Sequence, residues 1–263
     1  MSIRRKKIIP ALLSGAAFSP ADLPNLFSWL KNNITQDGFG NITWINEVHP
    51  TSSGIYPLFA AGNGCTITTL NGKNVLDCPG NNFQSGNDVG GGIPSTVPIF
   101  EQSNSSFTMG GIIDSTGISN GAFHRQSGVS NSQISLQQLI TGFVQLSIID
   151  ETGNAILVNS PNQLSVAGWT IIFLRFNWAT KLAEFIHGGS INTDSLFGLG
   201  NVTFVYPDNL NGAYTLNTRE TVNFPYTGGI GETFYYTDVK SDSDVNDLGN
   251  YLASEYNLSW TNI

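Results

Sequence analysis

A long series of short apolar segments separated by turn-forming residues is the feature that most constrains how this chain can fold. Between about residues 19 and 240, runs rich in Val, Ile, Phe, Trp and Thr alternate with clusters of Gly, Asn, Ser and Pro. Short strands at close spacing with turn signals between them are typical of a β-sandwich or a β-barrel. The expected strands span 26–30, 42–45, 107–113, 143–149, 155–159, 170–177, 182–187, 201–206 and 232–236.

The segment between Cys65 and Cys78 predicts a β-hairpin together with its register. Asn71-Gly72 lies between two alternating runs, and Asn-Gly strongly favours a type I′ hairpin turn. Counting outward from a two-residue loop places Cys65 opposite Cys78, in a non-hydrogen-bonded pair whose Cα atoms lie ~4.5 Å apart. That separation is at the short end of the disulfide range. Two interpretations stay open: a cross-strand disulfide, or two reduced thiols packed as small apolar side chains.

Helical signals occur near both ends of the β-rich region. Ser19 as N-cap and Pro20 at the first helical position predict a short helical turn. Ser241 and Asp244 fit a capping box that would begin a second, longer helix. The apolar stripe that follows at helical spacing is Val245, Leu248, Leu252 and Tyr256. We therefore expect one helical turn before the strands and one helix after them.

The charge distribution divides the chain into a basic arm, residues 1–18, and an acidic body, residues 19–263. The net charge is −8, although four of the eleven basic residues are in the arm. These basic residues are Arg4, Arg5, Lys6 and Lys7. An acidic body argues against nucleic-acid binding, because phosphate contacts need a basic patch. Without an apolar run of about 18 residues or more, no membrane insertion is expected. The arm itself could be a secretory signal, a tether to a partner, or a solvated terminus.

The residue types that carry catalysis are not arranged for it in this sequence. Glycoside hydrolysis needs two carboxyl groups about 5–9 Å apart, which on one strand means acids two residues apart. No glutamate has an acid two residues away. His49, His124 and His187 are far apart in the sequence, with no Gly-x-Ser-x-Gly elbow and no metal-ligand spacing. We therefore expect a protein that is not an enzyme and that has no metal and no cofactor.

Trp178 is the candidate for glycan binding. It is expected at the tip of a hairpin, between the strands 170–177 and 182–187, where a buried tryptophan is less expected. An exposed aromatic face can stack on a sugar ring, whereas Trp29, Trp44 and Trp169 lie in or beside strands and are expected in the core. The alternative for Trp178 is packing beneath neighbouring loops.

Several segments carry a resemblance to a known family. SPADLPNLFSWL and DGFGNITWINE place Trp29 and Trp44 on either side of a glycine turn. The segment AGWTIIFLRFNWATKLAEFIHGG begins with Trp169 and ends in a glycine turn. The closing segment GGIGETFYYTDVKSDSDVNDLGNYLASEYNLSW joins a strand, an acidic cap and a helix. In this order the segments resemble concanavalin A-like (laminin-G-like) domains of phage and bacterial surface proteins.

The resemblance implies an all-β, concanavalin A-like jelly-roll sandwich of two antiparallel sheets over residues 19–263. It also suggests the first functional hypothesis: a non-enzymatic structural or decoration protein on the surface of a phage-like virion. In that hypothesis the arm anchors the chain to other virion proteins in an oligomeric assembly, with the lectin-like domain outward. The alternative is a carbohydrate-binding adhesin or receptor-binding module, secreted or at a cell surface, that takes cell-surface polysaccharide. Proteins with this fold have many different functions, so the function has to be inferred from the geometry and chemistry of the binding site.

Overall fold

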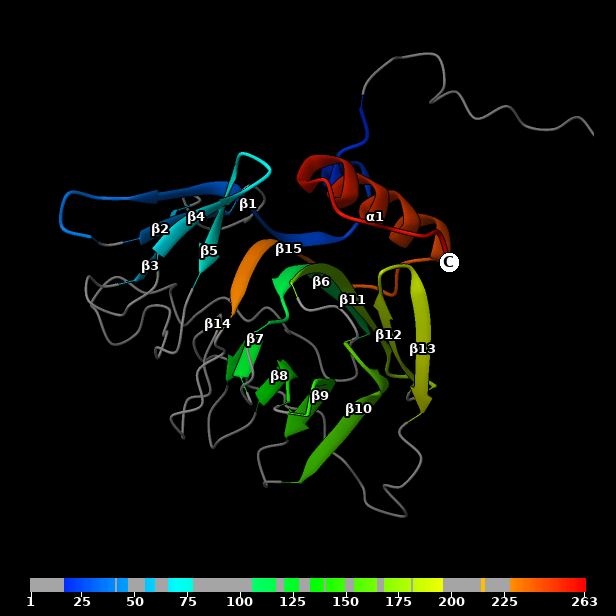
Figure 1. Cartoon of the computed structure of the whole chain (residues 1–263). Coiled ribbons are helices and arrows are strands. Elements are labelled where there is room, and N and C mark those ends of the chain that lie inside the picture. The colour runs from blue at the N-terminus through cyan, green and yellow to red at the C-terminus, as the bar shows by residue number, and fades with distance from the viewer. Residues whose placement is uncertain are drawn as a thin grey trace, which may run out of the picture.

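The structure is a β-sandwich with one helix on its outer side (Figure 1). It is a computed structural model, and it describes the residues 17–40, 42–46, 55–59, 66–77, 106–116, 121–127, 133–139, 141–149, 154–164, 168–180, 182–195, 214–215 and 228–263. Every strand pairing in both sheets is antiparallel. The predicted all-β class with two antiparallel sheets is confirmed. The predicted strand over 201–206 lies outside the described residues.

The larger sheet, sheet A, has ten strands, and its main path runs in the order β13-β12-β11-β6-β15-β1-β2-β3. The hairpin β4–β5 joins it where β5 pairs with β15. Its strands are β1 (Leu26–Gln36), β2 (Ile42–Asn46), β3 (Ile55–Phe59), β4 (Thr66–Leu70), β5 (Lys73–Asp77), β6 (Phe107–Asp114), β11 (Trp169–Asn177), β12 (Leu182–His187), β13 (Ser190–Ser195) and β15 (Gly229–Tyr236).

The smaller sheet, sheet B, has five strands in the order β10-β9-β8-β7-β14. Its strands are β7 (Gly121–Ser127), β8 (Gln133–Gln138), β9 (Phe143–Ile149), β10 (Ala155–Gln163) and β14 (Tyr214–Thr215). Sheet B lies on one side of sheet A, and the helix α1 (Asp242–Tyr256) lies on the other side (Figure 1). The chain thus forms three layers, with sheet A in the middle.

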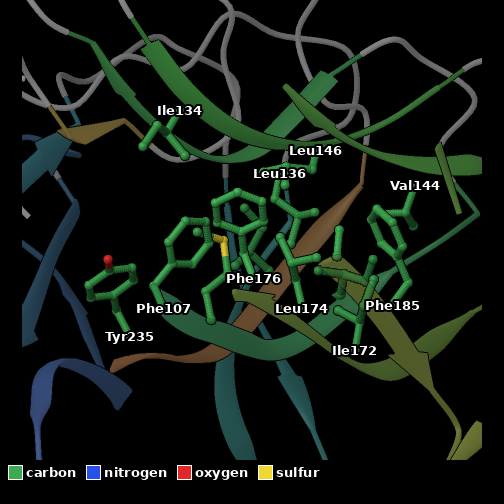
Figure 2. Packing of buried hydrophobic residues seen from close by; sticks show 14 of the residues in the cluster. Phe107, Ile134, Leu136, Val144, Leu146, Ile172, Leu174, Phe176, Phe185 and Tyr235 are labelled. Carbon is green, nitrogen blue, oxygen red and sulfur yellow. The ribbon is translucent and has the colours of Figure 1, made fainter. Parts of the chain in front are cut away.

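A hydrophobic core fills the space between the two sheets (Figure 2). Sheet A contributes large side chains such as Phe107, Phe176 and Phe185, while sheet B contributes aliphatic ones. The sheet B members are Ile134, Leu136, Val144, Leu146, Ile148, Ile156 and Val158. These occupy alternate positions along β8, β9 and β10, because successive side chains of a strand point to opposite faces of the sheet.

A second core lies between sheet A and α1, so the central strands of sheet A are buried on both faces. All eight residues of β15 are buried, and so are seven consecutive residues in both β6 and β11. The helix packs the predicted stripe, Val245, Leu248, Leu252 and Tyr256, against this face. Burial on both faces explains why these strands read as near-continuous apolar runs without alternation.

The predicted helical signals are confirmed in atomic detail. The 3-10 turn η2 (Pro20–Asp22) begins after Ser19, whose side chain forms a capping box with Asp22. Ser241 and Asp244 form the corresponding box at the start of α1. Within the described residues no helix is long and apolar enough to cross a membrane.

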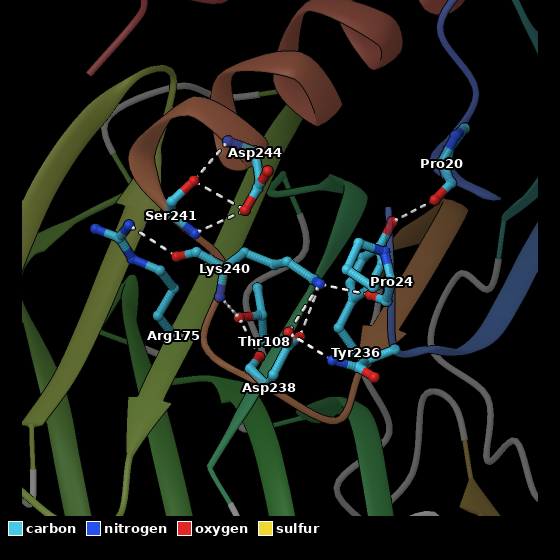
Figure 3. Close-up of polar contacts among 10 residues, drawn as sticks. Pro20, Pro24, Thr108, Arg175, Tyr236, Asp238, Lys240, Ser241 and Asp244 are labelled. Atoms are coloured by element: carbon cyan, nitrogen blue, oxygen red, sulfur yellow. Dashed lines mark hydrogen bonds and ion pairs between the residues drawn. The ribbon is translucent and has the colours of Figure 1, made fainter. Parts of the chain in front are cut away.

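Ion pairs and hydrogen bonds fix the segment that leads from β15 into α1 (Figure 3). Lys240 is 2% exposed; its ammonium group lies 2.8 Å from Asp238 Oδ1 and donates to the carbonyl of Pro24. Arg175, on β11, pairs with Glu184 at 2.8 Å and with Asp242 at 2.6 Å. The first turn of α1 is thereby attached to sheet A at a defined point.

The hairpin around Asn71-Gly72 has the predicted register. Leu70 pairs with Lys73, the pairing continues to Thr66 and Asp77, and both turn residues have positive φ. The face shared by Ile67 and Leu76 packs on the core between the sheets. Cys65 and Cys78 lie outside the described residues, so their predicted pairing stays a prediction.

The close contact between β6 and β15 predicts a strongly destabilising substitution. A Cβ atom added at Gly111 would overlap the backbone oxygen of Glu232, and no side-chain rotation can relieve that overlap. Gly111→Ala should therefore lower the free energy of unfolding by about 2 kcal/mol or more, measured by chemical denaturation. Gly38→Ala is the matched control, because nothing lies within 4 Å of its added Cβ. Equal stability of the two variants would contradict the described β6–β15 contact.

The hairpin register also defines a test for the two cysteines. If Cys65 and Cys78 are bonded, intact-mass measurement of the oxidised, unreduced chain will show the loss of two hydrogen atoms, and reduction will restore them. An unchanged mass and two reactive thiols after denaturation would establish the alternative, a pair of reduced thiols.

Candidate binding site

The candidate site is the outer face of sheet B, the face turned away from the core. Along β10 the burial pattern alternates strictly over six residues, with Ile156, Val158 and Ser160 buried and their neighbours exposed. In β8 and β9 the residues at alternate positions, Ile134, Leu136, Val144, Leu146 and Ile148, point into the core. The outward positions hold Ser135, Gln137, Phe143, Gln145, Ser147 and Ile149, of which Ser135, Gln137 and Ser147 are themselves buried. The outward positions of β8, β9 and β10 thus combine amide and hydroxyl groups with apolar side chains such as Phe143, Ile149 and Leu157.

Three amide side chains form a hydrogen-bonded ladder across this face. Gln137 on β8 pairs with Gln145 on β9, and Gln145 pairs with Asn159 on β10. The Nε2 atom of Gln137 donates to Oε1 of Gln145, and Nε2 of Gln145 donates to Oδ1 of Asn159 at 2.7 Å. We call Gln137, Gln145 and Asn159 the amide ladder.

The hydrogen bonds of the amide ladder run in one donor-to-acceptor direction, which determines the hydrogen-bonding groups left for a ligand. Gln137 is only 9% exposed and orients Gln145, which in turn uses the acceptor oxygen of Asn159. Asn159 is exposed, and its Nδ2 donates no hydrogen bond within the described part of the chain. The exposed end of the ladder thus presents two oriented N–H donors, because an amide nitrogen carries two hydrogens.

A second row lies beside the ladder and gives the face its shape. Ser135, Ser147 and Leu157 are paired across β8, β9 and β10. Both serines are 2% exposed, whereas Leu157 is 59% exposed. The accessible part of the face therefore follows β10, where an apolar side chain stands beside the amide donors of Asn159.

The sequence positions this site through local features of β9 and β10. The pairing register between them shifts after Asn159, and the Ser160 hydroxyl there accepts a hydrogen bond from the backbone N–H of Val144 at 3.0 Å. This bond ties the irregular part of β10 to β9. The regular pairing on the other side of it holds Asn159 opposite Gln145.

Trp178 lies elsewhere, in the turn that follows β11. Its backbone N–H donates to the Ser106 hydroxyl at 3.0 Å, and its ring lies edge-on to Phe176 with the centroids 6.1 Å apart. The side chain is half-buried and packs against the core between the sheets. Its position is thus intermediate between an exposed platform and a core residue, and its role in glycan binding stays a prediction.

The remaining predicted site residues are separate from this face or outside the described residues. The arm residues Arg4, Arg5, Lys6 and Lys7 lie outside the described residues, so anchoring by the arm stays a prediction. Trp29 is 6% exposed in the second core, as expected for a core tryptophan. His187 ends β12 at a glycine turn, and partial burial lowers its pKa.

The two described glutamates on β12 and β15 have structural partners. Glu184 pairs with Arg175, and Glu232 is buried beside Trp29. In the part of the chain that the structure describes, no group of three or more His, Cys, Asp or Glu side chains could hold a metal ion. The expectation that the protein has no catalytic activity stays a prediction.

Comparison with known proteins identifies the fold and no family. No protein-family model matches the sequence, and no curated protein sequence matches it. Among solved structures, the binding domain of botulinum neurotoxin serotype G superposes with a TM-score of 0.54 at 12% identity, over 88% of this chain and 52% of that one. The binding domain of Paraclostridial Mosquitocidal Protein 1 gives 0.53 at 14% identity, over 89% of this chain and 53% of that one.

A third solved structure, the CBM40 of a Ruminococcus gnavus IT-sialidase, is more distant. It has a TM-score of 0.43 at 16% identity and covers 56% of this chain and 84% of that one. The chain spans about half the length of the two toxin binding domains. At these identities the superpositions establish a shared β-sandwich fold.

Proposed function

We propose that this chain is a binding module that recognises a carbohydrate through the outer face of sheet B. The observation that carries this function is the amide ladder, whose exposed end presents oriented N–H donors beside an apolar side chain. Sugar hydroxyl oxygens accept such hydrogen bonds, and the apolar faces of a sugar ring pack on side chains such as Leu157. Binding sites commonly combine a few fixed polar groups with apolar contact area.

Preorganisation is the physical reason that the ladder suits recognition. A free glutamine or asparagine loses side-chain entropy when it binds a ligand. Here Gln145 and Asn159 are already oriented by bonds inside the sheet, so less of that entropy remains to be lost. The shared fold adds support, since the two toxin structures are described as binding domains.

The virion role rests on the sequence resemblance alone. Of the arm, the structure describes only residues 17 and 18, where Phe18 packs edge-on against Tyr251 of α1. No described residue bears on other virion proteins or on an oligomeric assembly. We therefore place carbohydrate recognition first and keep attachment to a virion or cell surface as an expectation about where the module works. A panel of uncharged and charged oligosaccharides, screened with the full chain, would identify the ligand used below.

The amide ladder predicts the effect of removing its middle member. Gln145→Ala breaks both ladder bonds and releases the orientation of Asn159, so affinity for the selected oligosaccharide should fall about tenfold, or about 1–2 kcal/mol. Isothermal titration calorimetry measures this change. Gln163→Ala is the control, because Gln163 is an exposed glutamine on β10 beyond the register shift. Equal affinity of both variants and the unaltered chain would contradict the proposed site.

Trp178 provides a separate test of where the sugar lies. If its ring stacks on the ligand, Trp178→Ala should weaken binding by about 1–3 kcal/mol. With the site on sheet B, the same variant should lose thermal stability, because Trp178 packs on the core, while keeping its affinity at temperatures where it is folded. Calorimetric binding and a melting curve on one sample distinguish these outcomes.

A further inference from the structure

Glu232 is a buried acid whose hydrogen-bond partners are neutral. The described part of the chain buries three charged side chains, those of Arg175, Glu232 and Lys240. Arg175 and Lys240 each form ion pairs with carboxylates. Glu232 is 1% exposed and forms no ion pair with another described residue. An uncompensated buried charge is costly, so burial favours the neutral carboxyl group.

The hydrogen bonds to Glu232 connect three elements of the fold. The Trp29 indole on β1 donates to Oε1 at 2.5 Å, and the Tyr256 hydroxyl on α1 donates to Oε2 at 2.9 Å. An indole N–H can only donate, so Oε1 must accept in either protonation state. A tyrosine hydroxyl can donate or accept, so Oε2 is the oxygen that can carry the proton. The site therefore accommodates both states, with a different hydrogen-bond direction toward α1 in each.

The groups around Glu232 determine how it titrates. They are Lys31 from β1, Tyr236 from β15, Tyr251, Tyr256 and Glu255 from α1, and Lys73 from β5. Lys31 lies over the Trp29 ring, 4.9 Å from its centroid, and Lys73 is ion-paired with Glu255. From β6, the neighbour of Glu232 is Gly111, which does not titrate. Burial raises the pKa of Glu232 to about 7, against the opposing hydrogen bonds from Trp29, Tyr256 and Tyr251 and the charge of Lys31.

We propose that Glu232 is a pH-sensitive latch that holds helix α1 most firmly on sheet A when its carboxyl group carries a proton. The latch acts at the C-terminal part of α1, through Tyr256, whereas Arg175 fixes the first turn of α1 by its ion pair with Asp242. Ionisation places a buried anion beneath the helix, and the hydrogen bonds from Trp29 and Tyr256 and the charge of Lys31 offset its desolvation only in part. The C-terminal part of α1 therefore loosens first as the pH rises.

The sign of the effect follows from proton linkage. Between the ordinary pKa of 4.5 and the folded-state value of about 7, the folded chain keeps a proton that the unfolded chain has released. Stability from this group is fully present below about pH 4.5 and is lost as the pH rises to about 7. Across that window the group increases the unfolding equilibrium constant by about tenfold per pH unit.

Comparison of the unaltered chain with Glu232→Gln isolates this term, because glutamine is neutral and similar in shape. Across pH 5–7 the unaltered chain should lose stability relative to Glu232→Gln, so the ratio of their unfolding equilibrium constants should increase. Above about pH 8 that ratio should stay constant. Asp247→Asn, at an exposed position on the same helix, is the matched control for removing a carboxylate from α1. Parallel stability curves for Glu232→Gln and the unaltered chain would overturn the latch.

A measurement on the unaltered chain keeps the latch testable if Glu232→Gln does not fold. The Trp29 indole N–H signal in a ¹H–¹⁵N NMR spectrum, assigned by its loss in Trp29→Phe, should titrate with a midpoint near pH 7. Amide protection factors in the C-terminal half of α1 should fall over the same range. A Trp29 signal that does not move between pH 5 and 9 would contradict ionisation of Glu232 in the folded chain.

Discussion

Burial of sheet A on both faces is the constraint on which the rest of the structure depends. Strands β6, β11 and β15 contribute side chains to two cores, one against sheet B and a second against α1. A strand in that position has no solvent face, so any polar group on it needs a partner within the protein. Arg175 and Glu232, on β11 and β15, are buried polar groups of this kind, and both connect sheet A to α1.

As a consequence, the two sheets differ in how much of their surface is available for binding a ligand. Sheet A is covered by α1 on one face and by sheet B on the other, and its buried polar groups attach the helix to it. Sheet B is covered by sheet A on one side, so its outer face can carry polar side chains that are not required for packing. Because these side chains are not needed for packing, we assign ligand recognition to the amide ladder. The buried polar groups near α1 are instead assigned to stabilising the contact between the helix and sheet A.

The sequence predicts the fold wherever a local signal determines it. Asn71-Gly72 fixed the register of one hairpin, Ser241 and Asp244 began α1 where expected, and β9 and β12 have the predicted bounds. The strands β3, β7, β8, β13 and β14 were missed. Segments such as QISLQQ are rich in glutamine and serine and depleted in β-branched residues, and β3 contains a proline. Which strands pair across the sandwich depends on contacts distant in sequence, and no local signal encodes them.

The candidate site was missed for the same reason. Each member of the ladder is an unremarkable glutamine or asparagine, and only the pairing of β8, β9 and β10 brings them together. The available signal was the alternation of amide or hydroxyl residues with apolar ones in QISLQQ, FVQLSII and AILVN. Sequence reasoning favoured Trp178 instead, because a tryptophan in a turn is conspicuous, whereas the structure packs it partly on the core.

The most direct measurement is an NMR titration of the side-chain amide signals of the full chain with the oligosaccharide that binds best. Recognition by sheet B predicts that the Asn159 and Gln145 amide signals shift saturably, while those of Gln163 do not. Saturable binding that leaves the ladder signals unmoved and shifts the Trp178 indole would place the site in the turn after β11. Absence of saturable binding to any oligosaccharide would contradict carbohydrate recognition itself.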